Sequence, residues 1–136
     1  MATLAHALQI IGSWIAPLVI FLIRRESRFV AFHALQALLL QIFHVVVLAI
    51  FMVGWFILIF STIFRVGSKP PGTPPIGFFV ALPLFWLVLV GANITILVIA
   101  IIYAVKAGRG EWADYPVLGR LARKILKMGP SGANVA

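Results

Sequence analysis

Four polar side chains interrupt an apolar stretch of the sequence and are the first candidates for chemistry. They are His33, Gln36, Gln41 and His44, and residues 29–64 around them carry no formal charge. At 100° per helical residue, the four fall within an arc of about 140° on one face of a helix. Such a polar stripe indicates a transport pathway, a cofactor ligand or a partner contact. Hydrogen bonds to neighbouring helices are the alternative.

The two histidines of this stripe cannot share a metal ion. His33 and His44 would lie about 16 Å apart along a helix, because each residue rises 1.5 Å. No metal site is therefore expected. A single imidazole is enough to ligate a haem or a chlorophyll-type pigment in a larger complex, so His44 is the candidate cofactor ligand and no other cofactor is expected. His6 is expected to be solvated.

The sequence offers little for catalysis. A hydrolytic site needs a nucleophile with a positioned base, or paired carboxylates, and the chain has three acidic residues. Glu26 lies between arginines, and Glu111 and Asp114 lie beside a basic tail, so all three are interpreted as ion-pair partners. We expect no enzymatic activity.

The composition is typical of a helical membrane protein. Of the 136 residues, 63% are hydrophobic and 10% are charged, against about 45–50% and about 25% in soluble domains. The net charge is +8, but the basic residues flank the apolar runs, as they do next to anionic lipid headgroups. This placement argues against nucleic-acid binding. There is no cysteine, which excludes disulfides and thiolate metal sites.

Three uncharged runs predict an all-α fold with three transmembrane helices. Residues 4–23 are just long enough to cross a hydrocarbon core of about 30 Å, and they lack the basic start of a secretory signal. Residues 29–64 would form a helix of about 54 Å, which is tilted or partly interfacial over residues 29–40. Residues 66–77 hold prolines and glycines that predict a loop, and residues 78–105 form the third span.

The charge distribution predicts the topology. Cytoplasmic segments collect lysine and arginine, so three spans place the N-terminus outside and the C-terminus in the cytoplasm. The chain then divides into a transmembrane domain, residues 1–106, and a cytoplasmic tail, residues 107–136. In the tail, residues 116–128 predict a basic amphipathic helix on the inner leaflet. No internal repeat is apparent.

The order of short motifs resembles a known family. The motifs are Arg24-Arg25-Glu26, then His33, Gln36 and Gln41, then Lys106-Ala107, Gly110-Glu111 and Tyr115-Pro116. This order resembles that of the small bacterial membrane proteins that are grouped with the twenty-kilodalton subunit of the chloroplast inner-envelope import translocon. The resemblance covers roughly residues 4–116 and implies a component of protein translocation.

Three spans would bring both motif groups to the cytoplasmic edge. An ion pair between Arg25 and Glu111 is expected to join the first loop to the tail. The full set of candidate partner-binding or structural residues is Arg24, Arg25, Glu26, Arg28, His33, Gln36, Gln41, Lys106, Glu111, Asp114 and Tyr115.

The function that the sequence favours is that of a non-enzymatic small subunit. It would lie in the bacterial cytoplasmic membrane as a multi-pass protein among anionic lipids, and pack against a larger membrane complex or against its own copies. One alternative is a component that forms or supports a path for protein translocation or insertion, lined by the polar stripe. The other is a pigment- or haem-binding subunit that uses His44.

Overall fold

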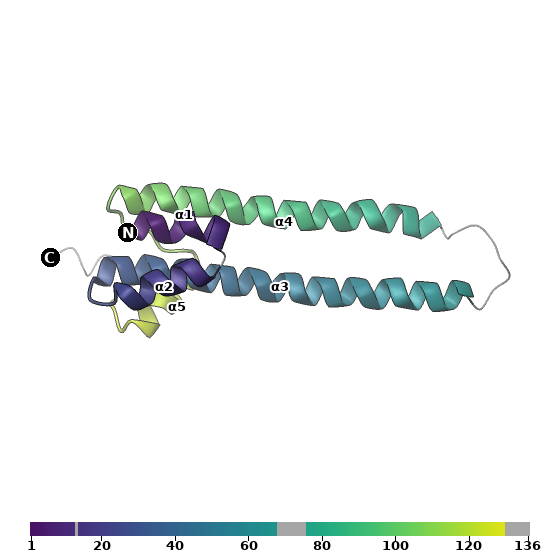
Figure 1. Ribbon diagram of the computed structural model, residues 1–136, viewed down its shortest axis with the longest axis horizontal. Helices are drawn as coiled ribbons and strands as arrows, with labels where there is room; N and C mark the ends of the chain where they lie inside the picture. The colour runs from purple at the N-terminus through teal and green to yellow at the C-terminus, as the bar shows by residue number, and fades with distance from the viewer. Residues whose placement is uncertain (13, 68–75, 130–136) are drawn as a thin grey trace. The chain divides into compact units, whose positions relative to one another are not determined.

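The computed structural model describes residues 1–12, 14–67 and 76–129. Within these residues the structure is α-helical and contains no strand. Its elements in chain order are α1 (Ala2–Gly12), α2 (Ile15–Ile23), α3 (Arg28–Gly67), α4 (Ile76–Gly108) and α5 (Leu118–Ile125) (Figure 1). The predicted all-helical class is confirmed for this part of the chain.

Two helices are long enough and apolar enough to cross a membrane. They contain the stretches Arg28–Arg65 and Phe79–Gly108, which correspond to the predicted second and third spans. The helices extend past the predicted ends on both sides, so that α3 has 40 residues and α4 has 33. Most of the predicted loop, residues 68–75, lies outside the described residues.

The predicted first span is not a single helix. Residues 4–23 form α1 and α2, of 11 and 9 residues, which pack against each other and run in opposite directions (Figure 1). Pro17 is the third residue of α2 and favours a helix start there, because its ring would crowd the carbonyl four residues earlier in a continuous helix. In a first turn the missing N–H costs nothing. At 1.5 Å per residue, α1 is only about 16 Å long, which is too short for a hydrocarbon core of about 30 Å. The described residues therefore contain two helices of spanning length rather than the predicted three.

The contacts divide the chain into two compact units. The first comprises residues 1–44 with the described part of 96–136, and the second comprises the described part of Val45–Thr95. Residues 107–129 belong to the first unit, so the segment after α4 packs with α1, α2 and the start of α3.

The second unit is an apolar helical hairpin. Phe85 stacks on Phe51 and Trp55, with ring centroids 5.4 Å and 4.5 Å away. Two of its polar side chains donate to backbone carbonyls of their own helix: Asn93 to Leu89 and Thr95 to Gly91, each at 2.8 Å. Most of its large apolar side chains are exposed, which suits a lipid surrounding better than water.

The first unit has a hydrophobic core between α2, α3 and α5. Phe32, Leu35, Leu38 and Ala122 are buried in it, and Leu18, Phe21, Trp112 and Leu126 are among the side chains that pack around them. Small residues let α5 approach closely, since Gly119 and Ala122 are both on its buried side. The apolar side chains of Leu121 and Ile125, on the same helix, are exposed.

Candidate functional site

A repeated four-residue segment builds the centre of the first unit. The residues His-Ala-Leu-Gln occur at 6–9 in α1 and again at 33–36 in α3, so the expectation of no internal repeat is wrong. The histidine and glutamine of each copy lie three residues apart on one helix face, and all four are at most 2% exposed. His6 is thus buried rather than solvated as predicted, and the repeat was the signal that could have shown it.

The two histidines and Tyr115 form a hydrogen-bonded chain. Tyr115 Oη lies 3.0 Å from His6 Nδ1, and His6 Nε2 lies 3.1 Å from His33 Nδ1. His33 Nε2 in turn lies 3.0 Å from the backbone carbonyl oxygen of Glu111. This series of hydrogen bonds begins at Tyr115 in the segment after α4, passes through His6 of α1 and His33 of α3, and ends at Glu111 in the same segment.

The geometry assigns a direction to every bond of this chain. The Glu111 carbonyl can only accept, so the His33 Nε2 carries the proton and His33 Nδ1 accepts. His6 then donates from Nε2 and accepts at Nδ1 from the Tyr115 hydroxyl. Both rings are neutral in this arrangement, and burial lowers the pKa of His6 to about 3. Burial also raises the pKa of the Tyr115 hydroxyl, which keeps it a donor.

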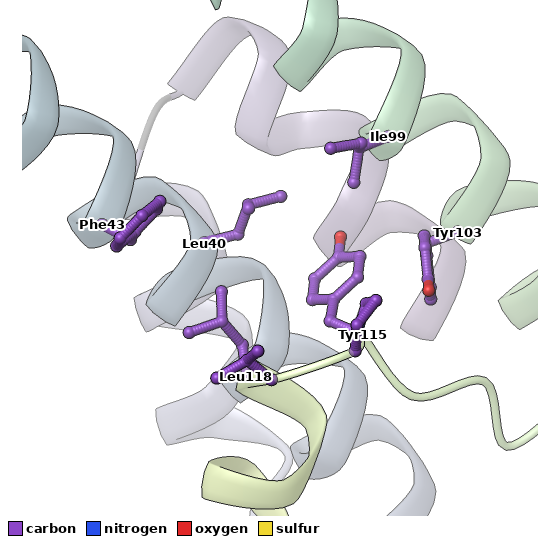
Figure 2. A pocket seen from close by; sticks show the side chains of 8 residues that line it. Leu40, Phe43, Ile99, Tyr103, Tyr115 and Leu118 are labelled. Carbon is purple, nitrogen blue, oxygen red and sulfur yellow. The ribbon is translucent and has the colours of Figure 1, made fainter.

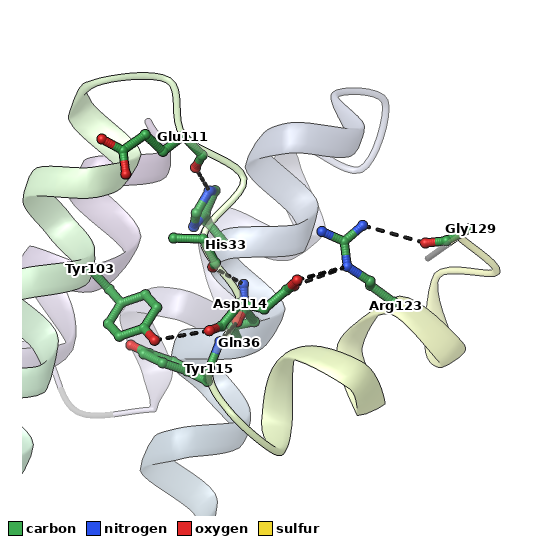
Figure 3. Close-up of polar contacts among 9 residues, drawn as sticks. His33, Gln36, Tyr103, Glu111, Asp114, Tyr115, Arg123 and Gly129 are labelled. Atoms are coloured by element: carbon green, nitrogen blue, oxygen red, sulfur yellow. Dashed lines mark hydrogen bonds and ion pairs between the residues drawn. The ribbon is translucent and has the colours of Figure 1, made fainter. Parts of the chain in front are cut away.

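Gln36 holds the backbone of the segment that follows α4 (Figure 3). Its Nε2 donates to the Ala113 carbonyl at 3.2 Å, and its Oε1 accepts from the Tyr115 N–H at 2.7 Å. Tyr103 of α4 donates through its hydroxyl to the Asp114 carbonyl at 2.9 Å. A segment without regular structure thus has its buried backbone groups satisfied by side chains.

An ion pair ties α5 to this same segment. Arg123 Nε lies 2.9 Å from Asp114 Oδ1, and its guanidinium carbon lies 4.7 Å from the centroid of the Phe32 ring. Arg123 is 6% exposed, so the ion pair is largely removed from water. Replacing one partner of such a pair lowers the free energy of unfolding more than replacing one partner of a surface pair. Sequence reasoning placed Arg123 only among the basic residues of the tail.

The predicted candidate residues divide into two groups. His33, Gln36, Asp114 and Tyr115 meet in the cluster just described, and Glu111 contributes its backbone carbonyl. Arg25 does not pair with Glu111 as predicted; its guanidinium carbon lies 5.2 Å from the centroid of the Phe21 ring, and the Glu111 side chain points away from the cluster (Figure 3). The remaining candidates lie on the surface or at its edge: Arg24, Glu26 and Arg28 are exposed, and Gln41 and Lys106 are half-buried.

His44, the candidate cofactor ligand, lies on α3 outside the cluster. It is 8% exposed, and among the described residues neither of its ring nitrogens has a hydrogen-bond partner. It does not line the cavity of the first unit. Within the described part of the chain, no group of three or more histidine or acidic side chains could hold a metal ion.

The cluster is structural, because its side chains hold the backbone of residues 111–115 by hydrogen bonds. The side chains of His6, His33, Gln36, Tyr103 and Tyr115 are hydrogen-bonded, and their bonds end on the backbone carbonyls of residues 111, 113 and 114 and on the backbone N–H of Tyr115. The amide of Gln9 is buried with no hydrogen-bond partner among the described residues. What the cluster can do chemically is fix residues 111–115 against α1 and α3, and keep two imidazoles neutral.

Comparison with known proteins gives the family. The family model of the magnetosome magnetite crystal formation proteins, MamF/MmsF, matches residues 1–122. No curated protein and no solved structure matched the chain. The match overturns the resemblance to the import translocon subunit, because the family model that covers residues 1–122 is a different one. The chain belongs to the MamF/MmsF family of magnetosome magnetite crystal formation proteins.

Proposed function

We propose that this chain is an integral protein of the magnetosome membrane and takes a non-enzymatic, accessory part in magnetite crystal formation. The observation that carries the proposal is the family match over residues 1–122. The two long apolar helices support the membrane location.

We propose that the chain crosses the membrane twice. The crossing parts are those of the second unit, residues 45–67 and 76–95, because about 20 apolar residues suffice for a helix to span the hydrocarbon core. The antiparallel pair of α1 and α2 then stays on the side where α3 begins and α4 ends. This topology keeps the charge asymmetry that suggested three spans. It differs in placing the N-terminus in the cytoplasm with the basic residues.

The accessory role rests on what the first unit presents at that cytoplasmic side. His33, Gln36 and Arg123 hold residues 111–115 and α5. The outer surface carries basic residues, including Arg24, Arg28, Arg109, Arg120 and Lys124. A rigid, basic surface suits an anionic membrane or an acidic protein partner. The partner we propose is a larger magnetosome membrane assembly or further copies of the chain.

The location can be tested by fractionation. An epitope-tagged chain is expressed in a magnetite-forming bacterium, and magnetosomes are collected with a magnet and washed with alkaline carbonate, which strips peripheral proteins. The proposal expects the tagged chain to be enriched in the magnetic fraction and to resist the wash. Recovery only in the non-magnetic cell membrane would contradict the magnetosome location, and release by carbonate would contradict membrane insertion.

A further inference from the structure

A cavity in the first unit is lined almost entirely by apolar and aromatic carbon (Figure 2). Its volume is about 580 Å³, and its lining comprises Leu40 and Phe43 of α3, Ile99 and Tyr103 of α4, and residues 115–118. This volume is in the range of small-molecule sites, roughly 300–1,000 Å³. The cavity is therefore large enough for a ligand and not only for a water molecule.

The lining offers a ligand contact area but no free hydrogen-bonding hydroxyl. Tyr103 donates its hydroxyl proton to the Asp114 carbonyl, and Tyr115 donates its own to His6. The other side chains of the lining are those of Leu40, Phe43, Ile99, Pro116, Val117 and Leu118, which have no polar atoms. A ligand that needs no hydrogen bond, such as an alkyl chain, gains burial there without leaving a polar group unpaired.

Cations lie next to this apolar lining. Lys106 Nζ is 5.4 Å from the centroid of the Tyr103 ring, and that ring is part of the cavity wall. Arg120 is exposed two residues after Leu118, and Lys124 is exposed one turn further along α5. The exposed apolar side chains of α5, Leu121 and Ile125, share its surface with these cations, which is the pattern of a helix at a lipid headgroup layer.

We propose that the cavity binds one acyl chain of an anionic phospholipid, whose phosphate is held by Lys106 and Arg120. The position along the chain agrees with this occupant. Leu40, Phe43 and Ile99 are the lining residues nearest in sequence to the apolar hairpin, which is described over residues 45–67 and 76–95. With the two crossings proposed above, the cavity lies where the headgroup region meets the hydrocarbon core. The lipid would anchor the first unit at the membrane surface. This inference requires a membrane around the protein but no part in crystal formation.

Photolabelling of the full-length protein in lipid nanodiscs tests the proposal. The discs contain phosphatidylglycerol and phosphatidylcholine, and one of the two carries a photoreactive diazirine at the end of an acyl chain. Labelled peptides are then identified by mass spectrometry. The proposal expects phosphatidylglycerol to label the lining residues more strongly than phosphatidylcholine does. Leu40→Trp and Leu118→Trp, which each place added bulk inside the cavity, should lower that labelling by about tenfold because the acyl chain loses apolar contacts.

Two matched variants make the test specific. Ile42→Trp adds the same bulk on the exposed side of α3 and should leave the labelling of the lining unchanged. Lys106→Gln combined with Arg120→Gln should remove the preference for phosphatidylglycerol. Uniform labelling of the exposed helix surfaces without enrichment in the lining would overturn the cavity site, as would normal labelling in both folded tryptophan variants. Equal labelling by the two lipids would overturn the role of the cations.

Discussion

At the scale of single residues, the main feature is a series of three hydrogen bonds that can form together only when both imidazoles are neutral. His33 donates to the Glu111 carbonyl, His6 donates to His33, and Tyr115 donates to His6. A second proton on His6 would have to sit on Nδ1, where it would displace the Tyr115 hydroxyl proton from its acceptor. Protonation of His6 therefore opposes the folded arrangement of the first unit.

The first unit should lose stability in mild acid. The pKa of His6 is lowered from 6.5 to about 3 in the folded chain, so between these values the unfolded state binds the extra proton. Above pH 6.5 this residue costs no stability, and as the pH falls towards about 3 it costs about 1.4 kcal/mol per pH unit. Thermal unfolding of the purified protein between pH 7.5 and about 5 measures the effect. His6→Gln should show a shallower decline, and identical pH profiles would contradict the assignment.

Gln36 should matter more to stability than His44, although both are polar residues of α3. Gln36→Leu leaves the Tyr115 N–H and the Ala113 carbonyl without their partner, at about 1–3 kcal/mol for each buried group. His44→Leu removes ring nitrogens that have no partner among the described residues, so it should be neutral or stabilising.

The two variants can be compared by the melting temperature in detergent and by hydrogen exchange over residues 111–115. Gln36→Leu should melt earlier and exchange faster over this segment, while His44→Leu should resemble the original protein. An equal loss in both variants would mean that the bonds of Gln36 do not hold the segment.

At the scale of elements, the sequence predicted the long helices α3 and α4 and a helix at the position of α5, but it merged α1 and α2 into one span. The uncharged runs gave α3 and α4 because length and apolar content decide a helix in lipid. The break between α1 and α2 was missed because twenty apolar residues are enough for one span. Burial of His6 and Arg123 depends on which helices meet, and that information is not local in the sequence.

The packing of α5 was missed for the same reason. Amphipathic patterning identified large apolar side chains, whereas the buried residues of α5 itself are Gly119, Ala122 and Arg123. A Cβ at Gly119 would lie 2.7 Å from the Cβ and 2.9 Å from the Cα of Asp114. No real Cβ is accommodated at such distances without movement of the backbone.

Gly119→Ala should therefore separate α5 from residues 111–115. We expect a loss of about 1–3 kcal/mol, which is typical of overpacking, and faster hydrogen exchange across Leu118–Ile125. Gly54→Ala is the matched control, because a Cβ there meets nothing within 4 Å and alanine favours a helix interior. Unchanged exchange in α5 of the Gly119 variant would show that the close approach is not required.

At the scale of the whole molecule, the charge distribution does not decide between two and three crossings. The basic residues before α3 and after α4 fall on one side in both topologies, and only the side of α1 differs. Cysteine labelling separates them because the chain has no cysteine of its own. With two crossings, Thr3→Cys and Ser27→Cys should react with a membrane-impermeant maleimide only after the cells are opened, and Thr73→Cys should react in the opposite compartment. If Thr3→Cys reacted in the same compartment as Thr73→Cys, the chain would cross the membrane three times.

The central claim is a role in magnetite crystal formation, and crystal dimensions measured by electron microscopy test it most directly. The host is a magnetosome-forming strain from which its own members of this family have been deleted. Expression of this chain should bring crystal number or length back towards those of the parent strain, and Gln36→Leu at equal protein level should do so less well. If crystals in the complemented strain match those of the deletion strain although the chain is present in the magnetosome membrane, the proposed function is wrong.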